Sequence, residues 1–326
     1  MTIDFPQSLS WTQVLGKTLS LPAVLYPGGG HRGVIRRWKL VARSLIQWPW
    51  TLEWYRFLEA PRLQVATAAR LRLYTKLQRP YSTRRHGFAA RLAALKTHYT
   101  WVEATLPEAT LNAIYRDPGL ELGRLPLEEG RSLVVRLCYT DRYEKEGDLS
   151  FSVFLAPAET MIYTVTVSVT ERAGVGRGVF IGGLQGGNAP DQPEIVRQLT
   201  REMFGMRPKA FALYLVQQLA DWIGAVEVRG VADSETVYRH LQNRKVIEAS
   251  YDRLWTESGG TMSPHDGCFD LPLRHVEIPR EEIKTSKRSL YQKRYALLRD
   301  LAAQLRAHWD QSSNRPTSTA QPQVPH

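Results

Sequence analysis

Four runs of residues that favour β-strands follow one another in the middle of the chain, and they constrain its fold more than any other feature. These runs are SLVVRLCYT (132–140), DLSFSVFLA (148–156), MIYTVTVSV (161–169) and GVFIGGLQG (178–186). Each is short, rich in β-branched and aromatic residues and bounded by turn residues. In the third run valine alternates with threonine or serine, the pattern of an antiparallel strand with one buried face. Four antiparallel strands are therefore expected here.

A helical region is predicted ahead of these strands. Apolar residues recur every three to four positions in stretches that Pro or Gly separates, namely Trp11 to Val24, Val34 to Phe57, Pro61 to Gln78 and Gly87 to Tyr99. A further short helix is expected from Thr105 to Tyr115, after which Pro118, Gly119 and Pro126 punctuate the chain. The sequence thus predicts a mostly helical region over residues 1–126.

After the fourth run, helical and strand patterns alternate, which predicts a crossover unit. The expected elements are helices at 194–204 and Pro208 to Ile223, a strand at 225–232, a short helix at Tyr251 to Glu257, a strand at 268–278 and a long basic helix from Arg280 to His308. We therefore expect an α+β fold. We expect residues 127–278 to form an α/β domain around a mixed, mainly antiparallel sheet. Residues 279–310 are expected to form a basic helix docked on this domain, and residues 311–326 a disordered tail.

The positive charge of the chain is confined to its first part. Residues 1–126 carry a net charge of +11, and the remaining residues are neutral. Because the charges are spaced along amphipathic helices, a solvated polar face is the first interpretation. An anionic membrane surface or an acidic acceptor is the next, and nucleic acid is disfavoured because no basic zipper, zinc finger or RNP-like sequence accompanies the charges.

Composition excludes several classes of protein. With 43% hydrophobic residues the chain is expected to fold around a proper core, and no run reaches the roughly 18 apolar residues of a membrane span. The start MTIDFPQSLSWTQ does not have the pattern of a signal peptide, so a cytoplasmic protein is expected. Cys138 and Cys268 are too few for a disulfide framework or a cysteine-rich zinc site. The scattered histidines, among them His98, His240 and His265, predict no metal site.

The glycine-rich segment IGGLQGGN (181–188) is the main candidate binding element. We expect a turn from Gly182 to Asn188 in which glycines let the backbone approach a phosphate or a pantetheine-like chain. Its candidate ligand-facing residues are Gly182, Gly183, Gln185 and Gly187. The segment lacks the spacing of the nucleotide-binding fingerprints, and a purely structural bulge or tight turn is the first interpretation, ahead of a ligand-facing role.

Two further segments carry candidate chemistry. Arg207 and Lys209 flank Pro208 at the start of a predicted helix, where free N–H groups attract anions, although an ordinary capped helix fits equally well. Tyr251, on the next short helix, can donate a proton to a leaving group. Its spacing from Trp255 also fits simple core packing.

Six separated segments, in this order, resemble the VirK/YbjX family of bacterial proteins. They are HYTW (98–101), YEKEGDL (143–149), IGGLQGG (181–187), TREMFGMRPK (200–209), SYDRLWTESGG (250–260) and SKRSLYQKRY (286–295). The resemblance spans Val34 to His308. It implies a cytoplasmic bacterial protein associated with virulence, tolerance of antimicrobial peptides and envelope stress, and it implies no known reaction.

A second resemblance, from Ser132 to Ile278, is to the acyl-CoA N-acyltransferase (GNAT-like) fold. In that family the fourth strand and the following helix hold the cofactor pyrophosphate, and a tyrosine on the next helix often protonates the departing thiolate. The resemblance implies acyl-CoA as cofactor and no metal. It casts Gly205, Arg207 and Lys209 as pyrophosphate contacts and Tyr251 as general acid.

The sequence departs from the GNAT-like pattern by inserting about 20 residues between the strand and the helix, in place of that family's compact loop. Glu171 and Asp252 are the candidates for the general base. Three hypotheses follow. The first is an acyltransferase acting on an envelope-related or peptide substrate, and the second is a non-catalytic stress or virulence factor that retains the fold. The third is a module that binds an anionic membrane or nucleic acid through residues 1–126.

Overall fold

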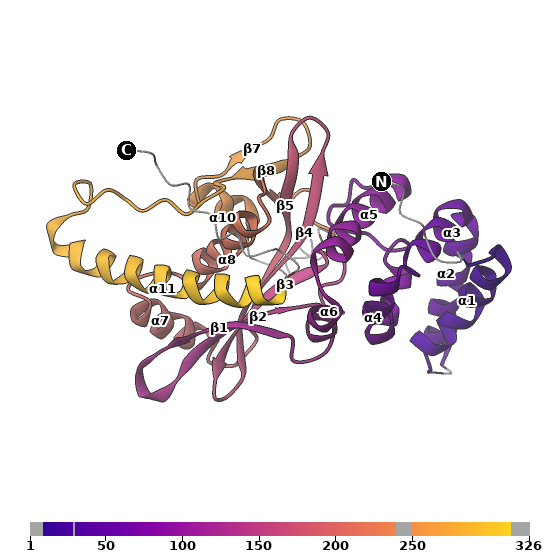
Figure 1. Ribbon diagram of the computed structural model, residues 1–326, viewed down its shortest axis with the longest axis horizontal. Coiled ribbons are helices and arrows are strands. Elements are labelled where there is room, and N and C mark those ends of the chain that lie inside the picture. The colour runs from indigo at the N-terminus through magenta and orange to yellow at the C-terminus, as the bar shows by residue number, and fades with distance from the viewer. Residues whose placement is uncertain (1–8, 29, 239–249, 314–326) are drawn as a thin grey trace, which may run out of the picture.

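A computed structural model of the chain describes residues 9–28, 30–238 and 250–313. Within these residues one eight-stranded sheet has the order β1-β2-β3-β4-β5-β6-β8-β7 (Figure 1). Its strands are β1 (Leu120–Pro126), β2 (Ser132–Cys138), β3 (Leu149–Ala156), β4 (Thr160–Arg172), β5 (Gly176–Gly186), β6 (Glu227–Val231), β7 (Thr261–Met262) and β8 (Cys268–Leu271). Neighbouring strands from β1 to β5 are antiparallel, β5 and β6 are parallel, and β6, β8 and β7 are antiparallel. The expected α+β fold with a mainly antiparallel sheet is confirmed.

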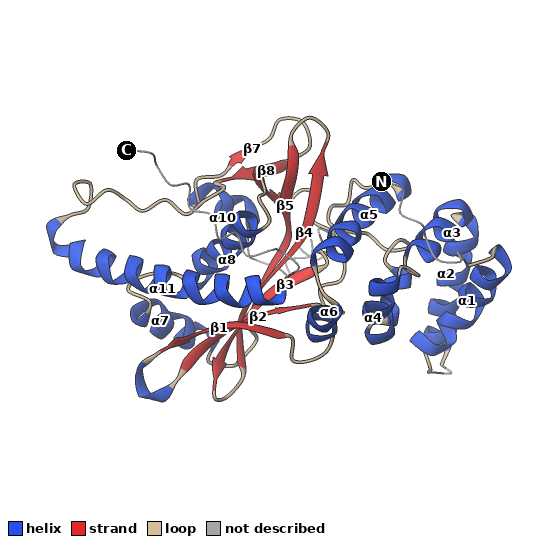
Figure 2. Cartoon of the chain, in the orientation of Figure 1, coloured by secondary structure: helices blue, strands red, loops and turns tan. Residues whose placement is uncertain are grey.

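The described helices surround this sheet. They are α1 (Trp11–Leu25), α2 (His31–Ile46), α3 (Trp48–Phe57), α4 (Pro61–Ala69), α5 (Phe88–Thr105), α6 (Glu108–Tyr115), α7 (Gln192–Glu202), α8 (Pro208–Trp222), α10 (Tyr251–Glu257) and α11 (Arg288–Ser312), with the 3₁₀ turns η1 (Leu71–Thr75), η2 (Glu128–Gly130) and η3 (Thr285–Lys287). Figure 2 shows α8 and α11 on one side of the sheet and α5, with the other N-terminal helices, on the other side. The predicted long C-terminal helix is present, although it begins at Arg288 rather than Arg280.

The helical region and the sheet share one buried core. Trp54 of α3 packs edge-on against Tyr99 of α5 at 5.7 Å between ring centroids, and both belong to the same buried cluster as the strand residues. On the other side, Trp222 of α8 contacts Phe151 of β3 and stacks on Trp309 of α11. Burial of these large rings on both sides fixes the helices against the sheet.

Three secondary-structure predictions were wrong in detail. Strand β1 lies where only a link punctuated by Pro118, Gly119 and Pro126 was predicted, because this stretch pairs with β2 and packs under α11. The helix predicted to reach Gln78 ends at Ala69 and continues as η1. The strand predicted at 268–278 ends at Leu271, because Pro272 has no N–H to continue the ladder.

The predicted turn from Gly182 to Asn188 was also wrong. Residues 182–186 continue β5, and Gly183, Leu184, Gln185 and Gly186 pair with β4. The loop begins only at Gly187. The predictions on His240 and on most of the C-terminal tail concern residues outside the described ranges.

Candidate active site where β5 and β6 separate

Strands β5 and β6 are paired over only part of their length. The parallel ladder joins Gly178–Ile181 to residues 227–230, and β5 then continues for five more residues without β6. A β-bulge interrupts its pairing with β4, where Thr166 is opposite Gly183 and Val167 is opposite Ile181, so that Gly182 is the extra residue. A bulge increases local twist, and bulges are frequent beside active sites. The last five residues of β5, 182–186, therefore have β4 on one side and no strand on the other.

The hydroxyl of Tyr251 occupies this open edge. Leu184 N donates a hydrogen bond to the Tyr251 hydroxyl at 3.1 Å, and the hydroxyl lies 3.4 Å from Leu184 O. Asp233, which follows β6, accepts from Tyr251 N at 2.8 Å and so places the start of α10 against β5. Burial raises the pKa of Tyr251 well above its ordinary value, so its hydroxyl keeps its proton.

Glu146 approaches the same edge from the loop between β2 and β3. Its side chain is 1% exposed, and Gln185 Nε2 donates to its Oε1 at 2.7 Å. The same Gln185 nitrogen lies 3.2 Å from the Tyr251 hydroxyl, which links the three side chains. Glu146 Oε2 has no hydrogen-bond partner within the described part of the chain. Glu146, Gln185 and Tyr251 thus form a polar triad in which Glu146 and Tyr251 are buried and Gln185 is half-buried.

Burial raises the pKa of Glu146 to about 8, with the Gln185 hydrogen bond opposing the shift. A carboxyl with this pKa exchanges a proton near neutral pH, and it lies beside a phenol that stays protonated. Two titratable groups whose surroundings suit opposite roles in proton transfer are typical of acid–base sites. The triad therefore has the residues for general base and general acid catalysis.

The glycines of β5 make room for Glu146. A Cβ atom on Gly182 would overlap the carbonyl oxygen of Glu146, and one on Gly183 would overlap its carboxylate. A Cβ on Gly187 would overlap Met161 O and approach Gln192. The glycine pattern is thus explained by close packing of protein groups against the end of β5.

The structure brings together some of the residues that the sequence singled out. Gly182, Gly183, Gln185 and Tyr251 meet at the triad. Helix α8 belongs to the crossover between the parallel strands β5 and β6. The helix of such a crossover runs antiparallel to its strands, so its start is expected toward the end of β5 that carries the triad. Gly205 contacts Arg294 of α11, whose guanidinium donates to Phe204 O at 2.6 and 2.9 Å.

Of the two proposed general bases, Asp252 directly follows Tyr251 at the start of α10, whereas Glu171 lies far from Tyr251. Asp252 accepts a hydrogen bond from Asp233 N at 2.8 Å, so its carboxylate ties the start of α10 to the segment after β6. Glu171, on β4, pairs with Arg177 near the start of β5. Arg177 is seven residues before Leu184, which corresponds to roughly 23 Å along the strand. The structure does not bring Glu171 near Tyr251.

Glu146 was missed by the sequence reasoning as a site residue. It was present only within the motif YEKEGDL, and no spacing rule connects this loop to Gln185, which lies 39 positions later. A short charged loop is ordinarily solvated, so its sequence signals neither burial nor a raised pKa.

A buried ion pair anchors the loop that carries Glu146. Lys76 Nζ lies 2.8 Å from Asp148 Oδ1 and donates to Gly147 O at 3.0 Å. Tyr99 donates to Asp148 at 2.9 Å, and Tyr81 also donates to it. Although burial alone raises the pKa of Asp148, Lys76 and these hydrogen bonds hold it below its ordinary value. The helical region thereby holds the loop in place.

Replacing Glu146 with glutamine is expected to change how stability depends on pH. The folded pKa of about 8 lies above the ordinary 4.5, so between these values the folded chain keeps a proton that the unfolded chain releases. The free energy of unfolding of the wild type therefore falls as pH rises through this window, by about 3 kcal/mol between roughly pH 5.5 and 8.5. The glutamine of E146Q does not titrate. Urea unfolding at pH 5.5 and 8.5 should therefore show that the free energy of unfolding falls with pH by about 3 kcal/mol less in E146Q than in the wild type.

The control for this experiment is Glu257→Gln, whose side chain is 51% exposed on α10. E257Q should reproduce the pH dependence of the wild type. Parallel behaviour of E146Q and the wild type would show that Glu146 has an ordinary pKa.

Neither a metal site nor a membrane-spanning helix is found among the residues that the structure describes. No group of three or more His, Cys, Asp or Glu side chains in those residues can hold a metal ion. No helix within the same ranges is long and apolar enough to cross a bilayer.

Comparison with known proteins gives a family but no solved relative. A family model described as "Protein of unknown function (DUF535)" matches residues 30–307. The chain is 27% identical over 279 residues to an Escherichia coli protein named "Uncharacterized protein YbjX", covering 84% of this chain and 83% of the relative. It is 28% identical over 166 residues to an "Uncharacterized protein" of Haemophilus influenzae, covering 51% of this chain and 54% of that relative. No solved structure matches the chain.

Proposed function

The chain belongs to the VirK/YbjX family (DUF535), and we propose that it transfers an acyl group from a coenzyme A thioester to an amine or hydroxyl of an acceptor. The observation that carries this proposal is the hydrogen-bonded triad of Glu146, Gln185 and Tyr251 at the open edge of β5. We place the activity in the cytoplasm, where reducing conditions suit the two free thiols, Cys138 and Cys268.

The arrangement of the sheet supports the resemblance to the acyl-CoA N-acyltransferase fold. Four antiparallel strands, β2 to β5, are followed by a helical crossover to the parallel strand β6, then by the tyrosine-bearing helix α10 and β8. The fourth of these strands, β5, is the one whose end carries the bulge and the triad. This is the place where the resemblance puts the thioester.

The start of α8 suits the diphosphate of coenzyme A. Pro208 is at the first helical position and no side chain caps the helix, so its first N–H groups are available to an anion. The side chains of Arg207 and Lys209 form no ion pair with any carboxylate in the described part of the chain. Arg294 adds a third cation beside Gly205. Bound there, coenzyme A supplies the activated acyl carbon.

The side chains of the triad then move the protons. Glu146, as carboxylate, accepts the proton that the attacking amine or hydroxyl loses as its bond to the acyl carbon forms. Tyr251 donates its proton to the sulfur as the carbon–sulfur bond breaks. Gln185, which hydrogen-bonds to both side chains, holds the carboxyl and the phenol in position. The proton on Glu146 then returns to the Tyr251 phenolate, so the cycle consumes no proton. We propose an envelope-related or peptide acceptor, with tolerance of antimicrobial peptides and virulence as the physiological outcome.

Titration of the protein with acetyl-CoA and longer acyl-CoAs, combined with an assay of thiol release, tests this function. We expect the wild type to bind an acyl-CoA and to cleave the thioester slowly in the absence of acceptor. Tyr251→Phe should lower the cleavage rate about 100-fold while leaving affinity unchanged, because a general acid contributes to the rate. Arg207→Ala combined with Lys209→Ala should lower affinity instead.

Two control variants separate these effects from general damage. Arg253→Ala removes a cation whose side chain is 80% exposed on α10, and Tyr291→Phe removes a hydroxyl from α11. Both should behave as the wild type. Absence of binding and of cleavage with every acyl-CoA would refute the enzymatic proposal and leave the non-catalytic hypothesis, in which the fold is kept without the chemistry.

A further inference from the structure

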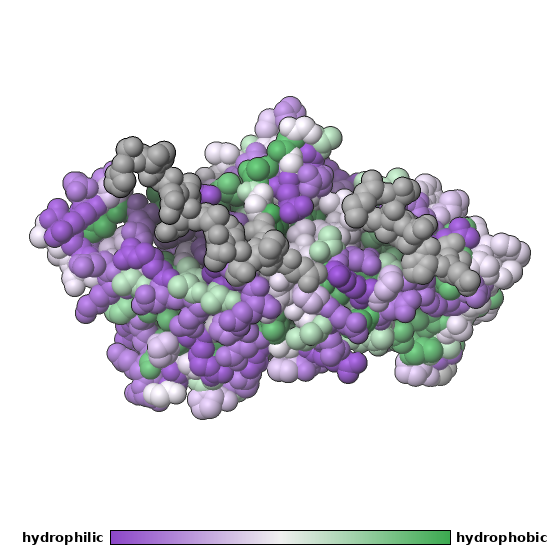
Figure 3. All heavy atoms as spheres, viewed as in Figure 1, coloured by the Kyte–Doolittle hydropathy of each residue, from purple (hydrophilic) through white to green (hydrophobic). Residues whose placement is uncertain are grey.

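Helix α2 exposes a stripe of apolar side chains. Its buried side consists of Leu40, Val41 and Ser44. The exposed apolar residues recur at helical spacing on another side: Val34, Ile35, Trp38 at 69% exposure, Leu45, and Ile46 at 75% exposure. In the space-filling view, hydrophobic spheres lie among hydrophilic ones at this helical end of the molecule (Figure 3). Apolar side chains on ordinary protein surfaces are scattered singly, whereas these five form one contiguous apolar area on a single helix.

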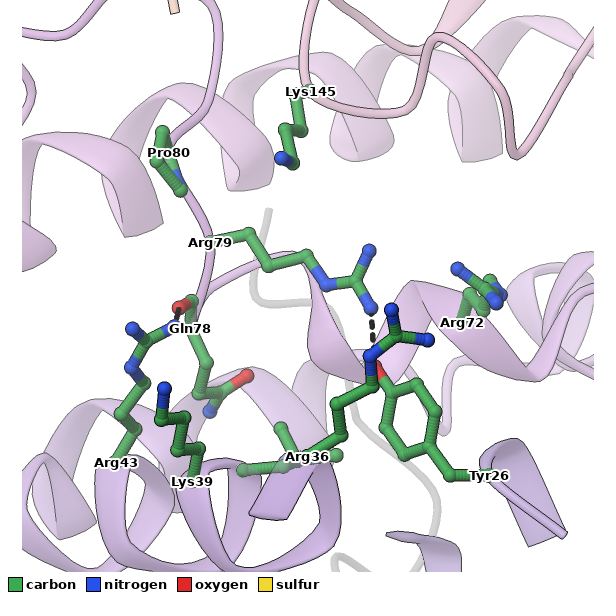
Figure 4. A pocket seen from close by; sticks show the side chains of 10 residues that line it. Tyr26, Arg36, Lys39, Arg43, Arg72, Gln78, Arg79, Pro80 and Lys145 are labelled. Carbon is green, nitrogen blue, oxygen red and sulfur yellow. Dashed lines mark hydrogen bonds between the residues drawn. The ribbon is translucent and has the colours of Figure 1, made fainter. Parts of the chain in front are cut away.

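A basic pocket of about 470 Å³ lies against the same helix. Its lining includes six cationic side chains, Arg36, Lys39, Arg43, Arg72, Arg79 and Lys145. Figure 4 shows Arg36, Lys39 and Arg43 rising from α2, and Lys145 pointing toward them from the opposite side. At about 100° per residue, Lys39 lies on α2 between Ile46 and Arg43, so the pocket borders the apolar stripe.

The positive charge of this pocket is only partly neutralised. Glu144 pairs with Arg79 and lies 3.5 Å from Arg72. Arg36, Lys39 and Lys145 make no ion pair with any carboxylate that the structure describes. Burial and the neighbouring Arg79 lower the pKa of Lys145, as expected where cations gather. The lining of the pocket therefore has the charge and the hydrogen-bond donors that suit an anion with several acceptor oxygens, such as a phosphate ester.

The geometry points to α2 as a docking surface for an anionic phospholipid membrane, with the apolar stripe in the interface and the pocket holding a lipid phosphate. Cations beside exposed tryptophan and isoleucine on one helix are the features of helices that lie in the plane of a bilayer surface. A nucleic acid or a soluble phosphate compound would account for the cations but not for Trp38 and Ile46. This inference does not depend on the proposed acyl transfer.

Co-sedimentation of the full chain with vesicles tests the inference. Vesicles of equal parts phosphatidylglycerol and phosphatidylcholine should bind the protein, vesicles of phosphatidylcholine alone should not, and salt should weaken binding. Lys39→Gln combined with Arg43→Gln should lower affinity about thirtyfold. Trp38→Ser combined with Ile46→Ser should lower it about tenfold or more.

Matched variants control for charge and for surface hydrophobicity. Arg197→Gln with Arg201→Gln removes two exposed cations from α7, and Val276→Ser removes an apolar side chain that is 75% exposed. Both should bind vesicles as the wild type does, and circular dichroism should show that all variants are folded. Three results would each overturn the inference: no vesicle binding, full binding by the Trp38 and Ile46 variant, or binding only to inorganic pyrophosphate or duplex DNA.

Discussion

Replacing Lys76 with methionine is expected to lower the free energy of unfolding by about 3–5 kcal/mol at neutral pH. Lys76 and Asp148 are 2% and 1% exposed, and their charges lie 2.8 Å apart. Without the ammonium, Asp148 is either an uncompensated buried charge or must take up a proton, and both cost free energy. Urea unfolding followed by circular dichroism measures the loss. The loss should shrink as pH falls, because acid protonates Asp148 in the unfolded chain as well.

Two further variants show whether the buried charge is the cause. Asp148→Asn in the K76M background should recover part of the loss, because no buried charge remains and the amide oxygen still accepts from Tyr99. Lys96→Met breaks a half-exposed pair with Glu53 and should cost less than about 1 kcal/mol. Equal stability of K76M and K96M would contradict the argument.

Replacing Gly182 with alanine is expected to cost about 3 kcal/mol or more, because the new methyl group must displace the Glu146 backbone. Gly186, four residues later in the same strand, is the matched control. A Cβ atom there would have the Tyr163 ring as its nearest neighbour, at 3.7 Å, which is ordinary contact. Gly186→Ala should therefore change stability by less than about 1 kcal/mol.

The same two glycine variants also distinguish the interpretations of the glycine-rich segment. In G182A the displacement of Glu146 should reduce the pH dependence of unfolding toward that of E146Q. If G182A and G186A are equally stable, close packing of Glu146 is not the reason for the glycine, and a ligand-facing backbone becomes the better explanation.

Local features of the sequence were sufficient for most elements. Pro208 begins α8 as predicted, because its fixed φ suits the first helical position. Residues 251–257 form the predicted short helix, and the alternating run at 161–169 lies in β4. Where local pattern and tertiary contact disagreed, contact decided. Strand β1 formed by pairing with β2, although the local sequence signals there are the turn residues Pro118, Gly119 and Pro126.

The sequence by itself determined the α+β class and the crossover between β5 and β6, because periodicity, proline and glycine act within a few residues. It also singled out Tyr251 as a candidate proton donor. Only the tertiary structure decided that the expected glycine turn is a strand, and that Glu146 is the carboxyl beside Tyr251. The loop of Glu146 is held against the sheet by Lys76, from the helical region, which pairs with Asp148. Burial and the pKa it produces depend on groups that are distant in the chain, so no local pattern can encode them.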